Sequence, residues 1–100
     1  MSPEGLTFEK VVFSAHAVRR IFERDFGKDD VVSVLDHGEV IDSYPEDRPY
    51  PSYLLLGFPR GEPLHVVVGL DESAETAVVV TAYMPDPELW DEDFRSRRKQ

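Results

Sequence analysis

Apolar residues early in the chain recur at the spacing of one helix face: Val18, Ile21, Phe22 and Phe26. Ser14 precedes this run, and serine is a favourable helix N-cap. Gly27 follows it, where glycine favours the end of a helix. The pattern predicts a first helix that begins near residue 15, buries the face around Val18 and ends before Gly27.

A second, shorter helix is predicted from Asp30 to His37, with an apolar stripe formed by Val31, Val34 and Leu35. Asp29 or Asp30 would cap this helix, and Gly38 would end it. His37 falls in the last turn, where an imidazolium interacts favourably with the helix dipole.

After Gly38, β-branched and aromatic residues alternate with turn residues, which is typical of strands. Four strands are predicted, the last three as an antiparallel meander: Glu39–Tyr44, Ser52–Phe58, Leu64–Leu70 and Thr76–Met84. The earlier segment Thr7–Phe13 is compatible with a strand but is too short for the pattern to separate one from a lead-in.

These elements predict one α+β domain over residues 1–100. Two helices, at about 15–37, would pack on one face of an antiparallel sheet of about four strands, at about 39–84. A charged tail from about residue 88 would begin as a short C-terminal helix anchored by Leu89, Trp90 and Phe94. A chain of 100 residues with 41% hydrophobic residues can form one core and has no room for a second domain.

Other features of the composition point to a soluble cytoplasmic protein. The chain has no cysteine, which excludes disulfides and Cys-type zinc sites and fits a reducing compartment. Met1–Lys10 has no apolar signal core, and the longest uncharged run, Pro49–Pro59, falls short of the roughly 18 apolar residues of a membrane helix. The oligomeric state stays open.

The net charge of −9 argues against simple affinity for nucleic acid, whose binders usually carry a positive surface. The positive residues are nevertheless concentrated in two places. Residues 16–28 carry a net charge of +2 and the last six residues one of +4. Any contact with RNA would therefore be local and sensitive to salt.

On the first helix, His16, Arg20 and Arg24 follow one another at intervals of four residues and form one stripe, opposite the apolar face around Val18. Such a stripe is commonly a solvated surface. It can also be an anion site, because two guanidiniums one turn apart can hold a phosphate while an imidazole titrates nearby.

In the third predicted strand, His65 lies on the face opposite Leu64 and Val66. It would stand opposite Thr81 or Tyr83 of the last strand if the hairpin register allows it, and a shift by one residue would separate them. The alternative is a half-buried strand histidine that donates to a backbone carbonyl.

Motifs for other chemistry are absent. The sequence has no H-E-x-x-H, no Cys pair and no Asp-x-Asp-x-Asp-Gly loop, so no metal and no cofactor is expected. Glycines are isolated, which excludes a phosphate-binding loop, and Ser14 lacks the G-x-S-x-G context of a nucleophile.

The sequence resembles a family of small bacterial proteins, domain of unknown function 4258. The resemblance lies in six segments: Phe13–Ala17, Arg20–Arg24, Gly38–Ile41, Tyr53–Gly57, Pro63–Val68, and Thr81–Pro87 with Trp90. It implies a RelE/barnase-like fold, in which two helices precede a four-stranded antiparallel sheet. It also implies a toxin-like, metal-independent RNA endonuclease of a bacterial type II toxin–antitoxin system, with a zinc-finger antitoxin resembling the MqsA family as partner.

RNA cleavage requires a base for the 2′-hydroxyl, an acid for the leaving 5′-oxygen and charge on the phosphate. His16 and His65 are the predicted acid and base, in an order left open, and Tyr83 orients the phosphate or donates a proton. The predicted phosphate ligands are Arg20, Arg24 and Thr81. The alternative is a non-catalytic module that binds a basic protein, because residues 31–94 contain 14 acidic residues and two basic ones.

Overall fold

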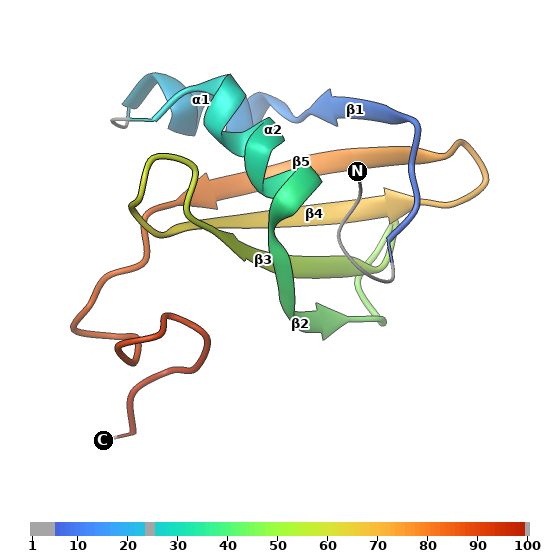
Figure 1. The fold of residues 1–100 in the computed structure, drawn as a ribbon. Helices are drawn as coiled ribbons and strands as arrows, with labels where there is room; N and C mark the ends of the chain where they lie inside the picture. The colour runs from blue at the N-terminus through green and yellow to red at the C-terminus, as the bar shows by residue number, and fades with distance from the viewer. Residues whose placement is uncertain (1–5, 24–25, 100) are drawn as a thin grey trace.

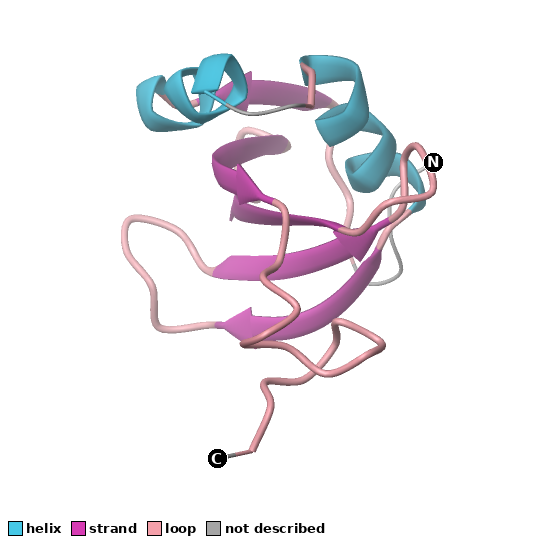
Figure 2. Ribbon diagram, turned by 90° about the vertical axis from the view of Figure 1, so that its left-hand side faces the viewer, coloured by secondary structure: helices cyan, strands magenta, loops and turns pink. Residues whose placement is uncertain are grey.

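The computed structural model describes residues 6–23 and 26–99. Along the chain the elements are β1 (Lys10–Phe13), α1 (Ala15–Glu23), α2 (Lys28–His37), β2 (Glu39–Tyr44), β3 (Ser52–Gly57), β4 (Leu64–Asp71) and β5 (Thr76–Tyr83). Within the described residues the strands form one five-stranded sheet in the order β1-β5-β4-β3-β2 (Figure 1). α2 lies across one face of this sheet, α1 lies at its edge in line with β1, and the C-terminal segment runs down from the end of β5 (Figure 1 and Figure 2). The α+β class is confirmed.

The sheet has five strands where four were expected, because the short segment before α1 is a strand. β1 pairs in parallel with β5, from Lys10 opposite Thr76 to Phe13 opposite Val79. The other neighbours are antiparallel. β1 ends at the level of Val79, so α1 takes its place beside the second half of β5.

The main core lies between α2 and the helix side of the sheet. Alternate residues of β4 point toward it: Leu64, Val66, Val68 and Leu70. α2 contributes the predicted stripe of Val31, Val34 and Leu35, none more than 1% exposed. The apolar pattern of this helix and of the central strands therefore predicts the core correctly.

The buried face of α1 differs from the predicted one. Ala17 is fully buried and Ile21 packs against the core, whereas Val18 is 40% and Phe22 86% exposed. Successive helix residues are rotated by about 100°, so this face lies about 80° from Val18. Arg20, expected opposite the core, therefore flanks the buried face and is itself half-buried.

Ser14 provides the physical reason for this rotation. Its hydroxyl accepts a hydrogen bond from the Ala17 amide at 3.0 Å, which confirms the predicted N-cap, and donates to the carbonyl of Val80 at 3.0 Å. Its own amide donates to the carbonyl of Val79. The start of α1 is thus held against β5, where the small side chain of Ala17 makes the contact.

The predicted C-terminal helix is wrong. After Tyr83 the described chain makes turns, and Trp90 pairs with Arg97 in an isolated antiparallel bridge. The Asp86 carbonyl closes a single turn, and Phe94 adopts a φ of 59°, which no helix of L-residues continues. Trp90 is the predicted packing anchor, at 7% exposure. In the described part of the chain, no helix is long and apolar enough to span a membrane.

Candidate functional site

His65 lies at the centre of the sheet, on the face away from the helices, and is fully buried. Cross-strand pairing places it between Leu56 of β3 and Tyr83 of β5. The C-terminal segment covers it, with the Trp90 ring edge-to-face at 4.4 Å between ring centroids. A buried imidazole needs hydrogen-bond partners for both nitrogens.

Both nitrogens of His65 have such partners. Nε2 lies 2.8 Å from the carbonyl oxygen of Phe94, and Nδ1 lies 3.3 Å from the hydroxyl of Tyr83. Because a carbonyl can only accept, Nε2 carries the proton and Nδ1 accepts from Tyr83. Burial lowers the pKa of His65, the bond to Phe94 opposes this, and the charge of Arg97 adds to the lowering. His65 is therefore a neutral acceptor that orients the Tyr83 hydroxyl.

A β-bulge at Val80 creates this pairing. From the hairpin turn to Val68, β4 and β5 pair in a register that, if continued, would place Ala82 opposite His65. The register shifts between Val67 and Val68, and Tyr83 comes to lie opposite His65 instead. The prediction that His65 faces a polar residue of the last strand is thus confirmed for Tyr83.

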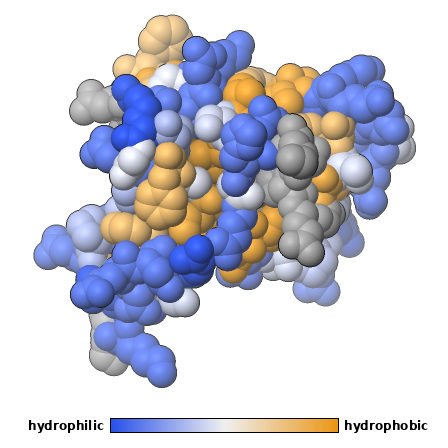
Figure 3. All heavy atoms as spheres, viewed as in Figure 1, coloured by the Kyte–Doolittle hydropathy of each residue, from blue (hydrophilic) through white to orange (hydrophobic). Residues whose placement is uncertain are grey.

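An open cleft of about 400 Å³ lies between α1 and the C-terminal segment. Its lining comprises Arg20, Glu23, Tyr83, Met84, Asp86, Leu89, Trp90 and Arg97. The surface of the C-terminal segment, at the lower left of Figure 3, is largely hydrophilic. We call this the first cleft.

Two guanidiniums and a phenol give the first cleft its chemistry. The Nε of Arg20 is buried and has no hydrogen-bond partner in the described part of the chain. The guanidinium of Arg97 lies 5.2 Å from the centroid of the Trp90 ring. Burial raises the pKa of Tyr83, and the charge of Arg97 opposes this. The cleft thus presents two guanidiniums and a phenol, which can hold a phosphate, beside the carboxylates of Glu23 and Asp86, which oppose an anion.

The structure brings together some of the predicted site residues. Arg20 and Tyr83 line the first cleft, and His65 lies directly behind Tyr83. His16 is exposed on α1, and neither it nor Thr81, which is half-exposed on β5, belongs to the cleft lining. Arg24 lies outside the described residues.

Sequence reasoning missed Trp90 and Arg97 as parts of the site, together with the cleft carboxylates of Glu23 and Asp86. The concentration of arginines in the last six residues was a signal. The position of Arg97 close to α1 follows only from the path that the C-terminal segment takes.

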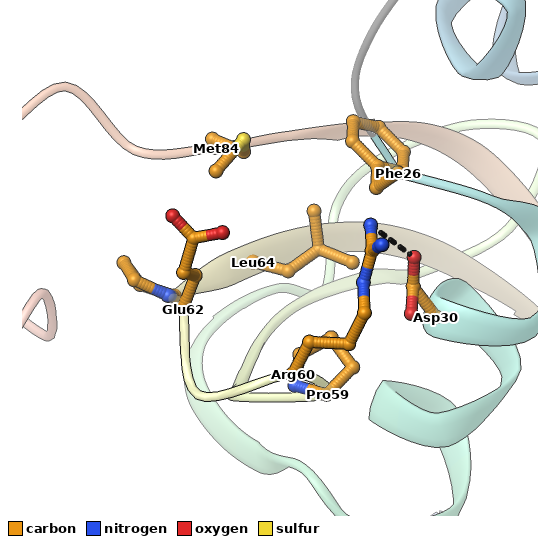
Figure 4. Close-up of a pocket in the computed structure, with 8 residues that line it drawn as sticks. Phe26, Asp30, Pro59, Arg60, Glu62, Leu64 and Met84 are labelled. Atoms are coloured by element: carbon orange, nitrogen blue, oxygen red, sulfur yellow. Dashed lines mark ion pairs between the residues drawn. The ribbon is translucent and has the colours of Figure 1, made fainter.

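A second hollow, on the helix side, has a structural role (Figure 4). Arg60 and Asp30 form an ion pair of 2.9 Å across it, and Asp30 also accepts a hydrogen bond from the Gly27 amide. Its volume of about 20 Å³ suffices for little more than a water molecule. The pair therefore joins α2 to the loop before β4.

Comparison with known protein families identifies the family of this chain. Residues 13–84 match a family described as a domain of unknown function (DUF4258). The chain belongs to this DUF4258 family. No match was found among curated proteins or among solved structures. In this DUF4258 domain, Arg20, His65 and Tyr83 lie within the matched residues, whereas Trp90 and Arg97 lie beyond them. Among the residues that the structure describes, no three His, Cys, Asp or Glu side chains are grouped to hold a metal ion.

Proposed function

We propose that this DUF4258 domain is a toxin-like RNA endonuclease that works without a metal ion, with the first cleft as its active site. One observation carries the proposal: Arg20, Arg97 and Tyr83 line one cleft, and the Tyr83 hydroxyl is held by a neutral, buried histidine. Phosphate binding is supported by the guanidinium of Arg20, which lines the cleft, and by that of Arg97, for which the described residues provide no ion pair.

The reaction would be attack of the ribose 2′-oxygen on the adjacent phosphorus, with departure of the 5′-oxygen. Glu23 would take the proton of the 2′-hydroxyl, because the other cleft carboxylate, Asp86, already accepts a hydrogen bond from the Glu88 amide. Tyr83 would donate its proton to the leaving oxygen after the hydroxyl hydrogen, which points to His65 Nδ1 in this structure, has turned toward that oxygen. Charge on the phosphorane would be stabilised by Arg20 and Arg97.

This assignment changes the role of His65. A side chain with no exposed surface does not touch RNA, so His65 is a positioning residue that holds Tyr83. His16 stays a predicted acid or base, at an exposed position outside the cleft lining.

The test is cleavage of a fluorescently labelled single-stranded RNA in the presence of EDTA. Tyr83→Phe is expected to lower the rate by about 10²–10⁴-fold, the usual contribution of a positioned acid or base. Arg20→Ala should also lower it, whereas Arg19→Ala, an exposed arginine on the same helix, serves as the matched control. RNA left intact by the unmodified protein would refute the proposal, and equal activity of the two arginine variants would refute the site.

A second candidate is a non-catalytic module that binds a protein. It is favoured by the exposed apolar pair Val18 and Phe22 on α1 and by the acidic composition of residues 31–94. The partner would be a basic protein, such as the zinc-finger antitoxin that the family resemblance implies. Growth arrest on expression that a neighbouring gene relieves would support the toxin; capture of that gene's product without any RNA cleavage would support the module.

A further inference from the structure

A second open cleft, of about 380 Å³, adjoins the first. It is lined by Ile41, Asp42, Tyr44, Leu54, Tyr83, Trp90, Arg95, Ser96 and Arg97. Tyr83, Trp90 and Arg97 line both clefts. A ligand bound at Arg97 in the first cleft can therefore continue into the second.

The sheet side of the second cleft contributes Tyr44, Ile41 and Leu54 to a lining whose exposed surface is mostly polar. Tyr44 ends β2 and is 38% exposed, so part of its ring is open to a ligand. Ile41 and Leu54 come from the same region of β2 and β3. Burial and the neighbouring Asp42 carboxylate raise the pKa of Tyr44, which keeps its ring neutral. Flat aromatic ligands such as nucleobases stack on rings of this kind.

The charges of the second cleft do not suit another phosphate. The Arg95 guanidinium is occupied by the Glu39 carboxylate, through Nε at 3.0 and 3.1 Å and Nη2 at 2.6 Å. Asp42 adds a carboxylate that would repel a phosphate. A carboxylate is, however, a good acceptor for the amino group on the edge of a base. The chemistry of this cleft thus differs from that of the first.

We propose that the second cleft is a nucleobase subsite, in which an unpaired base of single-stranded RNA stacks on Tyr44 while the adjoining phosphate lies at Arg97. This inference rests on the proposed function and names its substrate class. The ligand is a single strand, because the base in the cleft must be free of a pairing partner. Oδ1 of Asp42 accepts a hydrogen bond from the Ser43 amide, so its other oxygen would accept one from an amino group of that base.

The experiment measures binding of a fluorescent 2′-O-methyl RNA hexanucleotide, which lacks the attacking hydroxyl, by fluorescence anisotropy. Tyr44→Ala is expected to weaken binding about tenfold, within the range for loss of one stacked base. Tyr44→Phe should bind like the unmodified protein. Phe58→Ala removes a similarly exposed aromatic ring, 52% exposed, outside both clefts and is the matched control. The same hexanucleotide annealed to its complement should bind more weakly than the single strand.

The outcomes separate the subsite from the function on which it rests. If the unmodified protein binds the single strand and Tyr44→Ala binds it equally well, the subsite is refuted while the proposed function stands. Equal binding of the annealed hexanucleotide would also refute the subsite. If the unmodified protein does not bind the single strand at all, the proposed function fails and the subsite fails with it.

Discussion

The buried histidine makes the stability of this domain depend on pH just below neutrality. Folding places the His65 imidazole under Trp90, where its burial lowers its pKa from the usual value of 6.5. The groups that face it are the Tyr83 hydroxyl, the Phe94 carbonyl and, at longer range, the Arg97 cation. None of these is an anion that would stabilise an imidazolium. Between the two pKa values the unfolded chain therefore binds a proton that the folded chain does not.

The sign and the size of the effect follow from this difference. The stability that neutral His65 contributes is fully present above pH 6.5 and is lost as the pH falls toward the lower pKa of the folded state. One pH unit below the unfolded pKa, the loss in the free energy of unfolding has an upper limit of about 1.4 kcal/mol, which is reached when the folded imidazole stays fully neutral. Above pH 7.5 this loss is close to zero.

Urea denaturation between pH 7.5 and 5.5 measures the loss directly. His65→Gln keeps a donor and an acceptor but cannot titrate, so its free energy of unfolding should lack this loss. His16→Gln changes an exposed histidine of α1 and should keep the loss found in the unmodified protein. The reasoning is refuted if His65→Gln and the unmodified protein lose stability in parallel.

Two further predictions concern the joints between helix and sheet. A Cβ on Gly38 would lie 2.5 Å from the carbonyl oxygen of Val34, so Gly38→Ala should lower the free energy of unfolding by about 1–3 kcal/mol. Gly27→Ala meets nothing within 4 Å and should cost less in the same urea titration; equal costs would contradict the steric account. Ser14→Ala removes the cap of α1 and the hydrogen bond to Val80, so it should lower the free energy of unfolding by about 1–2 kcal/mol. A urea midpoint equal to that of the unmodified protein would contradict this expectation.

Where the sequence pattern was long and periodic, it predicted the fold correctly. The stripe of α2 and the alternation in β4 each repeat over several residues, so a single position hardly affects the result. The four residues of β1 carry no such repetition, and their partner strand comes more than 60 positions later. The rotation of α1 depends on Ser14 and on the small size of Ala17 rather than on its larger apolar residues.

The candidate site was predictable only in part for a related reason. His65 lies on a strand adjacent to that of Tyr83, and alternation along the two strands places opposite it either a polar residue of β5, such as Tyr83, or Ala82. The bulge at Val80 decides between them, and no residue type in the strand marks it beforehand. The path of the C-terminal segment depends on its contacts with Trp90 and Phe94, and these form only once the sheet exists.

The net charge of −9 describes the whole chain and differs from the local charge of the first cleft. Arg20 and Arg97 come from the two positive segments of the chain, and folding places them in one cleft together with Glu23 and Asp86. So few cations, offset by carboxylates, can neutralise only one or two phosphates, and each phosphate adds a limited, salt-dependent share of affinity. Under the proposed function, an RNA ligand would therefore gain much of its affinity from stacking. That requirement makes the ring of Tyr44 as important to the proposed function as the guanidinium of Arg20.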